Sequence, residues 1–236
     1  MRSIRISLCL CLWAAPTLAS PNPVDNAGQM VVVTTAGWDA VKGEMRLYER
    51  RKGKWKRHGS VIPVVVGQKG LAWGMGIMAD EEGPTKMEGD RRAPAGLFYL
   101  SRVLSASKVK TGMRFQKLTP GMTCVDDPKS RAYNRIVDGS GPRDWKSGED
   151  LSALYSLAVV VDHNVDPPLR GMGSCVFIHP WTRPGAGTLG CTALEGAALQ
   201  ALVGWLSSAH NPLLVQLPAS LYGSHQPIWG FPRLSP

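Results

Sequence analysis

The sequence predicts a mainly β domain with flanking helices, an α+β fold. The chain contains 26 Gly and 18 Pro among 236 residues, which is typical of a fold with many turns. Short apolar runs bounded by Gly, Pro and charged residues recur along it, as expected for strands. It shows neither internal repeats nor heptads, and its length suits one domain with a substantial core.

The N-terminus has the pattern of a secretory signal peptide. Arg2 and Arg5 form a basic region, residues 6–15 are apolar, and residues 17–19 offer a cleavage site. We expect residues 1–19 to be removed and the mature chain to lie in the periplasm or elsewhere in the extracytoplasmic envelope, without stable insertion in the membrane. An uncleaved anchor is the alternative.

The formal net charge of +9 favours an anionic polymer or membrane surface as partner. Export argues against nucleic acid, the usual alternative for a basic protein. The His and Cys spacings match no zinc pattern, so we expect neither a metal nor a cofactor.

Alternating and apolar segments predict strands, beginning with a hairpin that turns at Lys52-Gly53 between residues 43–49 and 54–58. The other predicted strands are residues 31–35, 61–66, a segment after Pro94, 157–161 and 213–217. Residues 67–77 are expected to form a loop. Apolar residues at helical spacing predict a helix over residues 197–207, and the tail 218–236 is expected to pack on the domain.

Three cysteines remain after signal cleavage, namely Cys124, Cys175 and Cys191. An odd number in an oxidising compartment implies one free thiol or an intermolecular bridge. The simplest hypothesis is a Cys124–Cys175 disulfide that leaves Cys191 reduced.

Residues 173–191 carry the strongest chemical signal. An apolar run ends on His179, a Pro- and Gly-rich loop follows, and Cys191 stands after Gly190. A thiol becomes a good nucleophile once an imidazole removes its proton. Residues 192–195 are suited to a helix N-terminus, whose dipole would favour a thiolate.

Other polar clusters supply candidate binding residues. Arg92 is a candidate clamp for a carboxylate, with a solvated pairing to nearby acids as the alternative. A polar loop holds Tyr133, Asn134 and Arg135, and His163, at a strand end, is a rival for the role of base.

These residues together resemble a known family. The segments GDRRAPAGLF (89–98), YNR (133–135), VVDHN (160–164) and the block 173–191 are similar to the L,D-transpeptidase catalytic domain, the YkuD-type fold of bacterial cell-wall enzymes. The resemblance runs from about residue 30 to about residue 217.

The resemblance implies a capsule-like β-sandwich and a defined reaction. Such enzymes release terminal D-alanine from peptidoglycan stem tetrapeptides through a thioester, then pass the acyl group to an amine, forming 3-3 cross-links, or to water. Cys191 would be the nucleophile, His179 the general base, and the backbone around Gly190 the oxyanion hole. Ser174, Asp162 or a backbone carbonyl could orient His179.

The sequence departs from the common family pattern around the thiol. Leu189 stands where the family usually has His, and no Arg follows Cys191. A displaced carboxylate clamp, at Arg92 or Arg135, is one interpretation. An L,D-carboxypeptidase that trims tetrapeptide to tripeptide and a non-catalytic wall-binding module are the alternatives.

Overall fold

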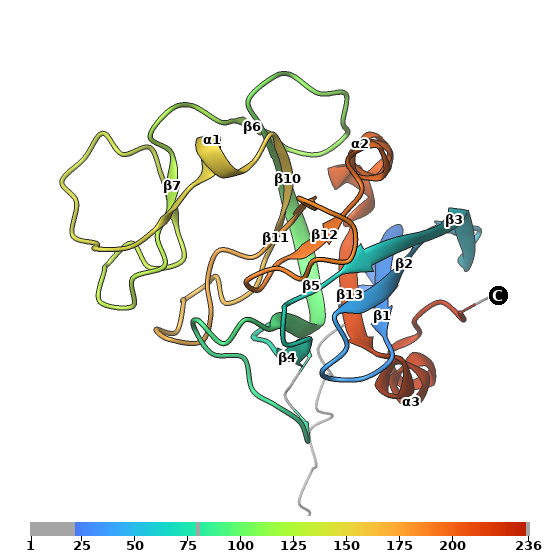
Figure 1. The fold of residues 1–236 in the computed structure, drawn as a ribbon. Helices are drawn as coiled ribbons and strands as arrows, with labels where there is room; N and C mark the ends of the chain where they lie inside the picture. The colour runs from blue at the N-terminus through green and yellow to red at the C-terminus, as the bar shows by residue number, and fades with distance from the viewer. Residues whose placement is uncertain (1–21, 79–80, 235–236) are drawn as a thin grey trace, which may run out of the picture.

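The structure is a computed structural model that describes residues 22–78 and 81–234, so the predicted signal peptide 1–19 lies outside the described residues. Within these ranges, one ten-stranded sheet and a small three-stranded sheet make up most of the fold (Figure 1). The predicted mainly β class is confirmed. The large sheet contains β1 (Gln29–Thr35), β2 (Lys42–Arg51), β3 (Lys54–Val65), β4 (Leu71–Trp73), β5 (Ala93–Ser105), β6 (Phe115–Lys117), β10 (Leu157–Val161), β11 (Phe177–Pro180), β12 (Thr192–Leu194) and β13 (Leu213–Pro218).

The small sheet and the helices complete the described elements. The small sheet contains β7 (Thr123–Cys124), β8 (Ile136–Val137) and β9 (Glu149–Asp150); the helices are α1 (Leu151–Leu154), α2 (Gly196–Trp205) and α3 (Ala219–Trp229), with 3-10 turns η1 (Pro23–Asn26) and η2 (Ser208–His210). Figure 1 shows β7 and its loops on one side of the large sheet and α3 on the other. Among the described residues, no helix is long and apolar enough to cross a membrane.

The large sheet closes on itself. Its strand order is β10-β11-β12-β3-β2-β1-β13-β5-β4, and β10 also pairs with β5. The strands from β10 round to β5 therefore form a barrel. Every residue of β1 is buried, because this strand runs through the centre of the sheet and is covered on both faces.

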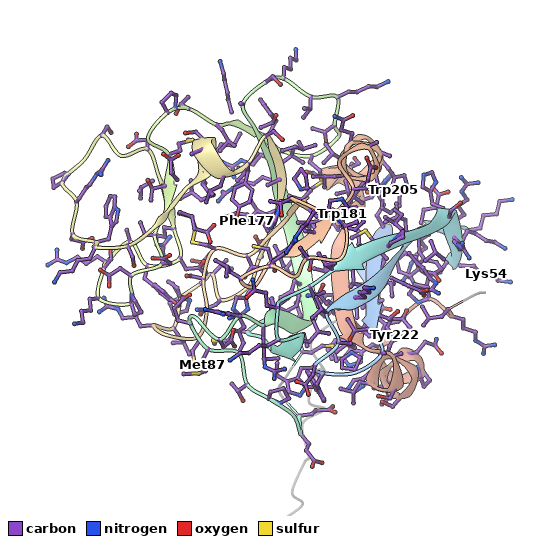
Figure 2. All side chains as sticks on the ribbon, in the orientation of Figure 1. Lys54, Met87, Phe177, Trp181, Trp205 and Tyr222 are labelled. Carbon is purple, nitrogen blue, oxygen red and sulfur yellow. A yellow bond between two sulfur atoms is a disulfide. The ribbon has the colours of Figure 1, made fainter. Side chains whose placement is uncertain are left out.

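The predicted hairpin is confirmed. It joins β2 to β3 through Lys52 and Gly53, which both have positive φ (50° and 75°), as a type I′ turn requires. Figure 2 shows Lys54 at its projecting end. The strand predicted over residues 61–66 is present up to Val65, as the end of the long strand β3 and not as a separate strand. The prediction of a loop over residues 67–77 was wrong in part, because it contains β4, which pairs in parallel with β5.

The helix predicted over 197–207 is α2. The Glu195 side chain caps it by accepting a hydrogen bond from the Ala198 amide, and its apolar face buries Leu199, Leu202 and Val203. The tail contains a helix that was not predicted, α3, which packs against β1 and β13. Tyr222 of this helix is buried (Figure 2).

A second, smaller hydrophobic core lies between the two sheets. Its members come from distant parts of the chain and include Leu104, Cys124, Leu151, Tyr155, Val160, Cys175, Phe177 and Cys191. Cys124 and Cys175 form a disulfide with an S–S distance of 2.09 Å, as hypothesised from the sequence. This bond ties the small sheet to the segment that leads into β11.

Candidate active site

A cavity of about 440 Å³ opens beside β11 and β12 and contains the predicted thiol. Its lining combines the segment around His179 and Cys191 with side chains from the small sheet and from the loop before β5. The charged or titratable side chains in this lining are Lys86, Glu88, Asp126, Glu149, Tyr155, His179 and Cys191.

Parallel pairing of β11 with β12 brings Cys191 and His179 together. Ile178 is paired with Thr192, and the Phe177 amide donates a hydrogen bond to Cys191 Sγ over 3.4 Å. Cys191 therefore lies beside Phe177, and His179 lies two residues farther along the same strand. Since alternate strand residues share a face, the thiol and the imidazole project from the same face of the sheet.

The residues after Cys191 do not start a helix, which corrects the sequence prediction. Thr192–Leu194 form β12, whose Ala193 and Leu194 are buried against β3. The helix begins at Gly196. A helix dipole therefore does not act on the sulfur.

The free thiol of Cys191 is 7% exposed. It donates a weak hydrogen bond to the Cys175 carbonyl, with Sγ and O 3.5 Å apart. Burial, followed by the charge of Glu149, raises the pKa of the thiol to about 12. In this resting arrangement the thiol is protonated, and a base must remove its proton before it reacts.

His179 is held in the tautomer that a base needs. Its Nδ1 lies 2.9 Å from the Pro180 carbonyl, which can only accept, so Nδ1 carries the hydrogen and Nε2 is the basic nitrogen. Of the orienting groups considered from the sequence, the backbone carbonyl has this role. Burial lowers the pKa of His179, which keeps the ring neutral near pH 7.

Gly190 provides close backbone access in front of the thiol. Its φ is 158°, and a Cβ added there would lie 3.3 Å from the Arg92 carbonyl, so a side chain would be crowded. Neighbouring Leu189 is 69% exposed at the cavity. Thr188 fixes this turn, because its Oγ1 donates to the Cys191 carbonyl and accepts from the Gly190 amide.

Sequence reasoning missed Tyr155 and Glu149. The Tyr155 ring lies 5.0 Å from the His179 ring and 5.4 Å from Phe177, between centroids. Its hydroxyl donates to Glu149 Oε2 over 3.0 Å, and its side chain lies in the same small core and cavity as Cys191. Only the placement of β9 and α1 against β11 reveals this cluster, because the residues are 36 or more positions before Cys191.

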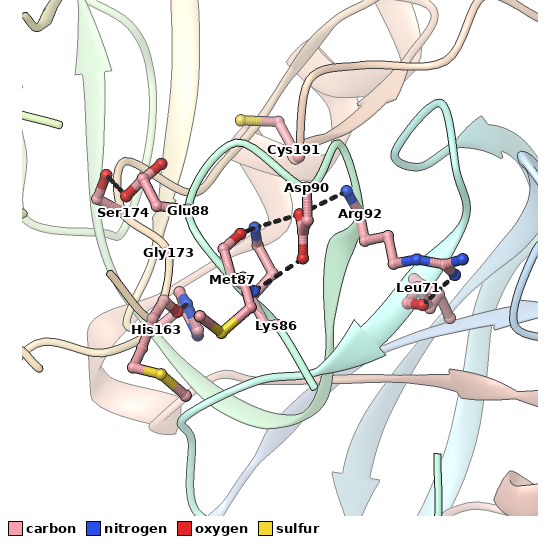
Figure 3. Close-up of polar contacts among 12 residues, drawn as sticks. Leu71, Lys86, Met87, Glu88, Asp90, Arg92, His163, Gly173, Ser174 and Cys191 are labelled. Atoms are coloured by element: carbon pink, nitrogen blue, oxygen red, sulfur yellow. Dashed lines mark hydrogen bonds and ion pairs between the residues drawn. The ribbon is translucent and has the colours of Figure 1, made fainter. Parts of the chain in front are cut away.

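Lys86 was also missed, and it lines the same cavity as the thiol. Its side chain is 5% exposed, and Nζ donates to Asp90 Oδ1 over 2.6 Å and to the Met87 carbonyl over 2.7 Å (Figure 3). A Cβ on Gly190 would lie 4.0 Å from this nitrogen. A buried cation thus stands close to the turn that presents Cys191.

The two arginines proposed as carboxylate clamps lie elsewhere. Arg92 turns away from the cavity and donates to the Leu71 carbonyl over 2.9 Å (Figure 3). It also donates to Asp39 Oδ1 over 2.7 Å. Arg135 lies in a neighbouring cavity and approaches Asp166 at 3.9 Å. In this structure, both therefore stand apart from the thiol, because other groups hold them.

Tyr133 and Asn134 support the site without lining it. The Tyr133 hydroxyl donates to Glu88 Oε2 over 2.6 Å. The Asn134 amide accepts a hydrogen bond from the Cys175 backbone and donates to the carbonyls of His163 and Asn164. These contacts hold the loops behind the disulfide, and neither residue lines the cavity that contains Cys191, so direct contact with substrate stays a prediction.

His163 does not compete with His179 for the role of base. It is 1% exposed, packs edge-on to Phe98, and has Nε2 3.0 Å from the Met172 carbonyl. Burial and the Lys86 charge lower the pKa of His163 to about 4. It lies outside the cavity that holds Cys191.

Comparison with known proteins identifies the fold family. The family model of the L,D-transpeptidase catalytic domain (YkuD) matches residues 39–215, most of the chain. The chain belongs to this family. The family resemblance inferred from the sequence motifs is therefore confirmed, and the block from His179 to Cys191 lies inside the matched region.

Two solved structures resemble the chain, and no curated protein sequence matches it. Both are crystal structures of the helical cell shape determining protein Pgp2 from Campylobacter jejuni, the second of a mutant with one substitution. Their sequence identities are 15% and 16% and their TM-scores 0.41 and 0.40, over 82% of this chain. The chain spans about half the length of those proteins, 49% and 48%.

Proposed function

We propose that this protein is an exported cysteine acyltransferase that acts on peptidoglycan stem peptides. The observation that carries the proposal is the shared face of Cys191 and His179, inside a cavity of the family's catalytic domain. A cysteine acyltransferase requires a free thiol, an imidazole with a free basic nitrogen, and backbone that a substrate can approach closely. Cys191, His179 and Gly190 supply these three parts.

The first half of the reaction releases D-alanine. His179 Nε2 takes the thiol proton, and the sulfur attacks the carbonyl carbon of the residue before D-alanine. Backbone N–H groups around Gly190 and Cys191 stabilise the oxyanion. When the tetrahedral intermediate collapses, the C–N bond breaks, the imidazolium gives its proton to the leaving amine, and a thioester remains on Cys191.

The second half resolves the thioester. An amine of a second stem peptide gives its proton to His179 and attacks the same carbonyl carbon, and the thiolate leaves and is reprotonated. The product is a 3-3 cross-link. The overall exchange replaces one amide bond with another and needs no cofactor.

Lys86 is the proposed anion site for the substrate. An ammonium has three hydrogens, and two of those on Nζ are taken by Asp90 and Met87. The third is free to bind the carboxylate of the terminal D-alanine near Gly190. This assigns to Lys86 the clamp that the sequence interpretation gave to Arg92 or Arg135.

Hydrolysis of the thioester is the second candidate. Asp126 lines the same cavity and would hold water close to the acyl group. An L,D-carboxypeptidase results if water reaches the carbonyl carbon before an amine does.

Mass spectrometry of peptidoglycan incubated with the full chain tests these proposals. New 3-3 dimers with released D-alanine would support the transpeptidase, and tripeptides alone would support the carboxypeptidase. The Cys191→Ala variant is the control and should do neither. If the wild type binds the wall as tightly as this variant and leaves its peptides unchanged, the chain is a wall-binding module instead.

The cellular location follows from the same proposal. The peptidoglycan substrate lies outside the cytoplasm, and the formal charge of +9 favours docking on an anionic wall. We therefore infer a periplasmic or extracytoplasmic location, with residues 1–19 as the signal peptide. Fractionation of cells that produce the tagged chain would test it, together with N-terminal sequencing of the product.

A further inference from the structure

The Tyr155 hydroxyl lies between two groups that compete for its single hydrogen. It donates to Glu149 Oε2 over 3.0 Å, and Tyr155 lies with Cys191 in the same small core and the same cavity, where the phenol and the thiol interact electrostatically. A phenol has one hydrogen to donate. When that hydrogen is on Glu149, it is not available to the sulfur.

The surroundings hold this arrangement in place. Glu149 is paired with Cys124 in the small sheet, and Cys124 is bonded to Cys175. The Cys175 carbonyl in turn accepts the Cys191 thiol hydrogen. Tyr155 packs against Phe177, whose amide donates to the same sulfur. The carboxyl, the phenol and the thiol are thus fixed to one covalently linked frame.

A thiolate at Cys191 would need the hydrogen that Tyr155 gives to Glu149. The Phe177 amide supplies one donor to the sulfur, and a buried anion is stabilised by each further donor. An ionised Glu149 both withdraws the phenol hydrogen and places a second negative charge nearby. A protonated Glu149 can itself donate to the phenol oxygen, which frees the phenol hydrogen for the sulfur.

We propose that Glu149 and Tyr155 form a positioning relay for Cys191. Ionised Glu149 holds the Tyr155 hydrogen away from the sulfur, and protonated Glu149 releases it to the thiolate. The relay is independent of which acceptor resolves the thioester. It acts on the nucleophile through Tyr155, without contact between Glu149 and the substrate.

The electrostatics of the cavity are consistent with a Glu149 carboxyl that gains or loses its proton near neutral pH. Burial, together with the charges of Asp126 and Glu88, raises the pKa of Glu149 to about 7, against the opposing hydrogen bond from Tyr155. The other charged or titratable groups that face the sulfur and the relay are His179 and Lys86. Lys86 favours the thiolate, and Glu149 disfavours it.

The rate at which iodoacetamide alkylates Cys191 tests the relay without any peptidoglycan. It is followed from pH 6 to 10 in the full chain by mass spectrometry of the Cys191 peptide. Glu149→Gln removes the charge and offers an N–H to the Tyr155 oxygen, so it should alkylate about tenfold faster at pH 8, equivalent to a thiol pKa about one unit lower. An unchanged profile would overturn the proposal.

Two further variants separate the relay from simple charge repulsion. Glu149→Met removes the same charge but offers no N–H, so it should gain less than Glu149→Gln. In a Tyr155→Phe background, the gain from Glu149→Gln should fall below about threefold, because coupled residues are not additive. The relay would be refuted if Glu149→Gln and Glu149→Met raised the alkylation rate equally, or if Glu149→Gln raised it by the full factor in the Tyr155→Phe background. Either result would show that the charge of Glu149 acts on the thiol by repulsion through space.

Glu88→Gln is the matched control. Glu88 lines the same cavity and accepts from a tyrosine hydroxyl, that of Tyr133, in a contact like the one between Glu149 and Tyr155. Tyr133 does not line the cavity that holds Cys191. The rate of Cys191 alkylation in Glu88→Gln should therefore stay within about twofold of the wild-type rate at each pH. An acceleration equal to that of Glu149→Gln would overturn the proposal. Thermal melting of each variant checks that it is folded, and the comparison of Gln with Met stands even if Tyr155→Phe does not fold.

Discussion

The Phe177 amide donates to the sulfur of Cys191 over 3.4 Å, two residues before His179 on the same strand. This contact fixes where the thiol lies relative to the His179 imidazole. The two groups come together through parallel pairing of β11 and β12. The short spacing of His179 and Cys191 in the sequence is compatible with this geometry.

Substitution of His179 tests whether this residue removes the thiol proton, because turnover and alkylation of Cys191 should respond differently. We expect His179→Gln to lower D-alanine release from a stem tetrapeptide by at least about 100-fold, because a general base contributes at this level. Alkylation of Cys191 at pH 10 should continue in the same variant, since hydroxide then removes the proton. Turnover close to that of wild type would contradict the role of His179.

The anion site at Lys86 can be tested through substrate binding. Lys86→Gln removes the charge and keeps a hydrogen-bond donor, so we expect KM for the tetrapeptide to rise about tenfold or more with a smaller change in kcat. A substrate whose terminal carboxylate is amidated should show little difference between wild type and variant. If both substrates respond equally, Lys86 does not recognise that carboxylate.

Folding stability should fall as the pH is lowered, through His163. Burial lowers its pKa to about 4 in the folded chain, against about 6.5 when unfolded. Between these values the unfolded chain binds a proton that the folded chain excludes, so the free energy of unfolding falls by up to about 3 kcal/mol from pH 6.5 to pH 4.

Glu149 has the opposite effect over part of this range. Its raised pKa, about 7, makes the folded chain bind a proton first, so its contribution to stability falls as the pH rises from about 4.5 through 7. Urea unfolding of wild type and His163→Gln at several pH values isolates the histidine from this effect. The difference between the two proteins should change with pH, and parallel curves would disprove the assignment.

The disulfide should contribute most of its stabilisation through the unfolded chain. Cys124 and Cys175 enclose a separation of 51 residues, for which the loop-entropy relation gives about 4 kcal/mol. We expect the double variant Cys124→Ala, Cys175→Ala to lose about 2–4 kcal/mol in denaturant unfolding. A reducing agent should lower the stability of wild type and leave that of the variant unchanged. A variant as stable as wild type would show that the bond is dispensable.

The elements that depend on local pattern were predictable from the sequence. The hairpin at Lys52-Gly53 has its turn residues, and α2 has a helical apolar face. The disulfide followed from the count of three cysteines together with the sequence context of Cys191, which marked it as the free thiol. For the hairpin and the helix, a short stretch of sequence was enough to predict the element, and for the disulfide the number of cysteines limited the possible pairings.

The elements that depend on tertiary packing were not predictable. Thr192–Leu194 is too short to show a period, and pairing with β3 and β11 makes it a strand. The helix α3 contains Pro227 and forms where Tyr222 is buried against Phe231, with ring centroids 5.7 Å apart. Such contacts override weak local propensity.

The wall of the active-site cavity was missed for the same reason. Lys86 and Glu149 precede Cys191 by more than 40 positions and carry no motif that links them to a thiol. Closure of the barrel and attachment of the small sheet bring them to the cavity. Arg92 shows the opposite case. Its position in the sequence suggested a carboxylate clamp, but its guanidinium is hydrogen-bonded to Asp39 and the Leu71 carbonyl, away from the cavity.

During oxidation of the newly made chain, Cys175 can form a disulfide with either Cys124 or Cys191. Cys175 lies 16 residues from Cys191 and 51 residues from Cys124, so loop closure alone favours the wrong partner by about 1 kcal/mol. A bridge between Cys175 and Cys191 would consume the nucleophile. Correct assembly of the small sheet therefore keeps the proposed nucleophile as a free thiol, and an isomerase that reshuffles mispaired cysteines would increase the yield of correctly bridged protein.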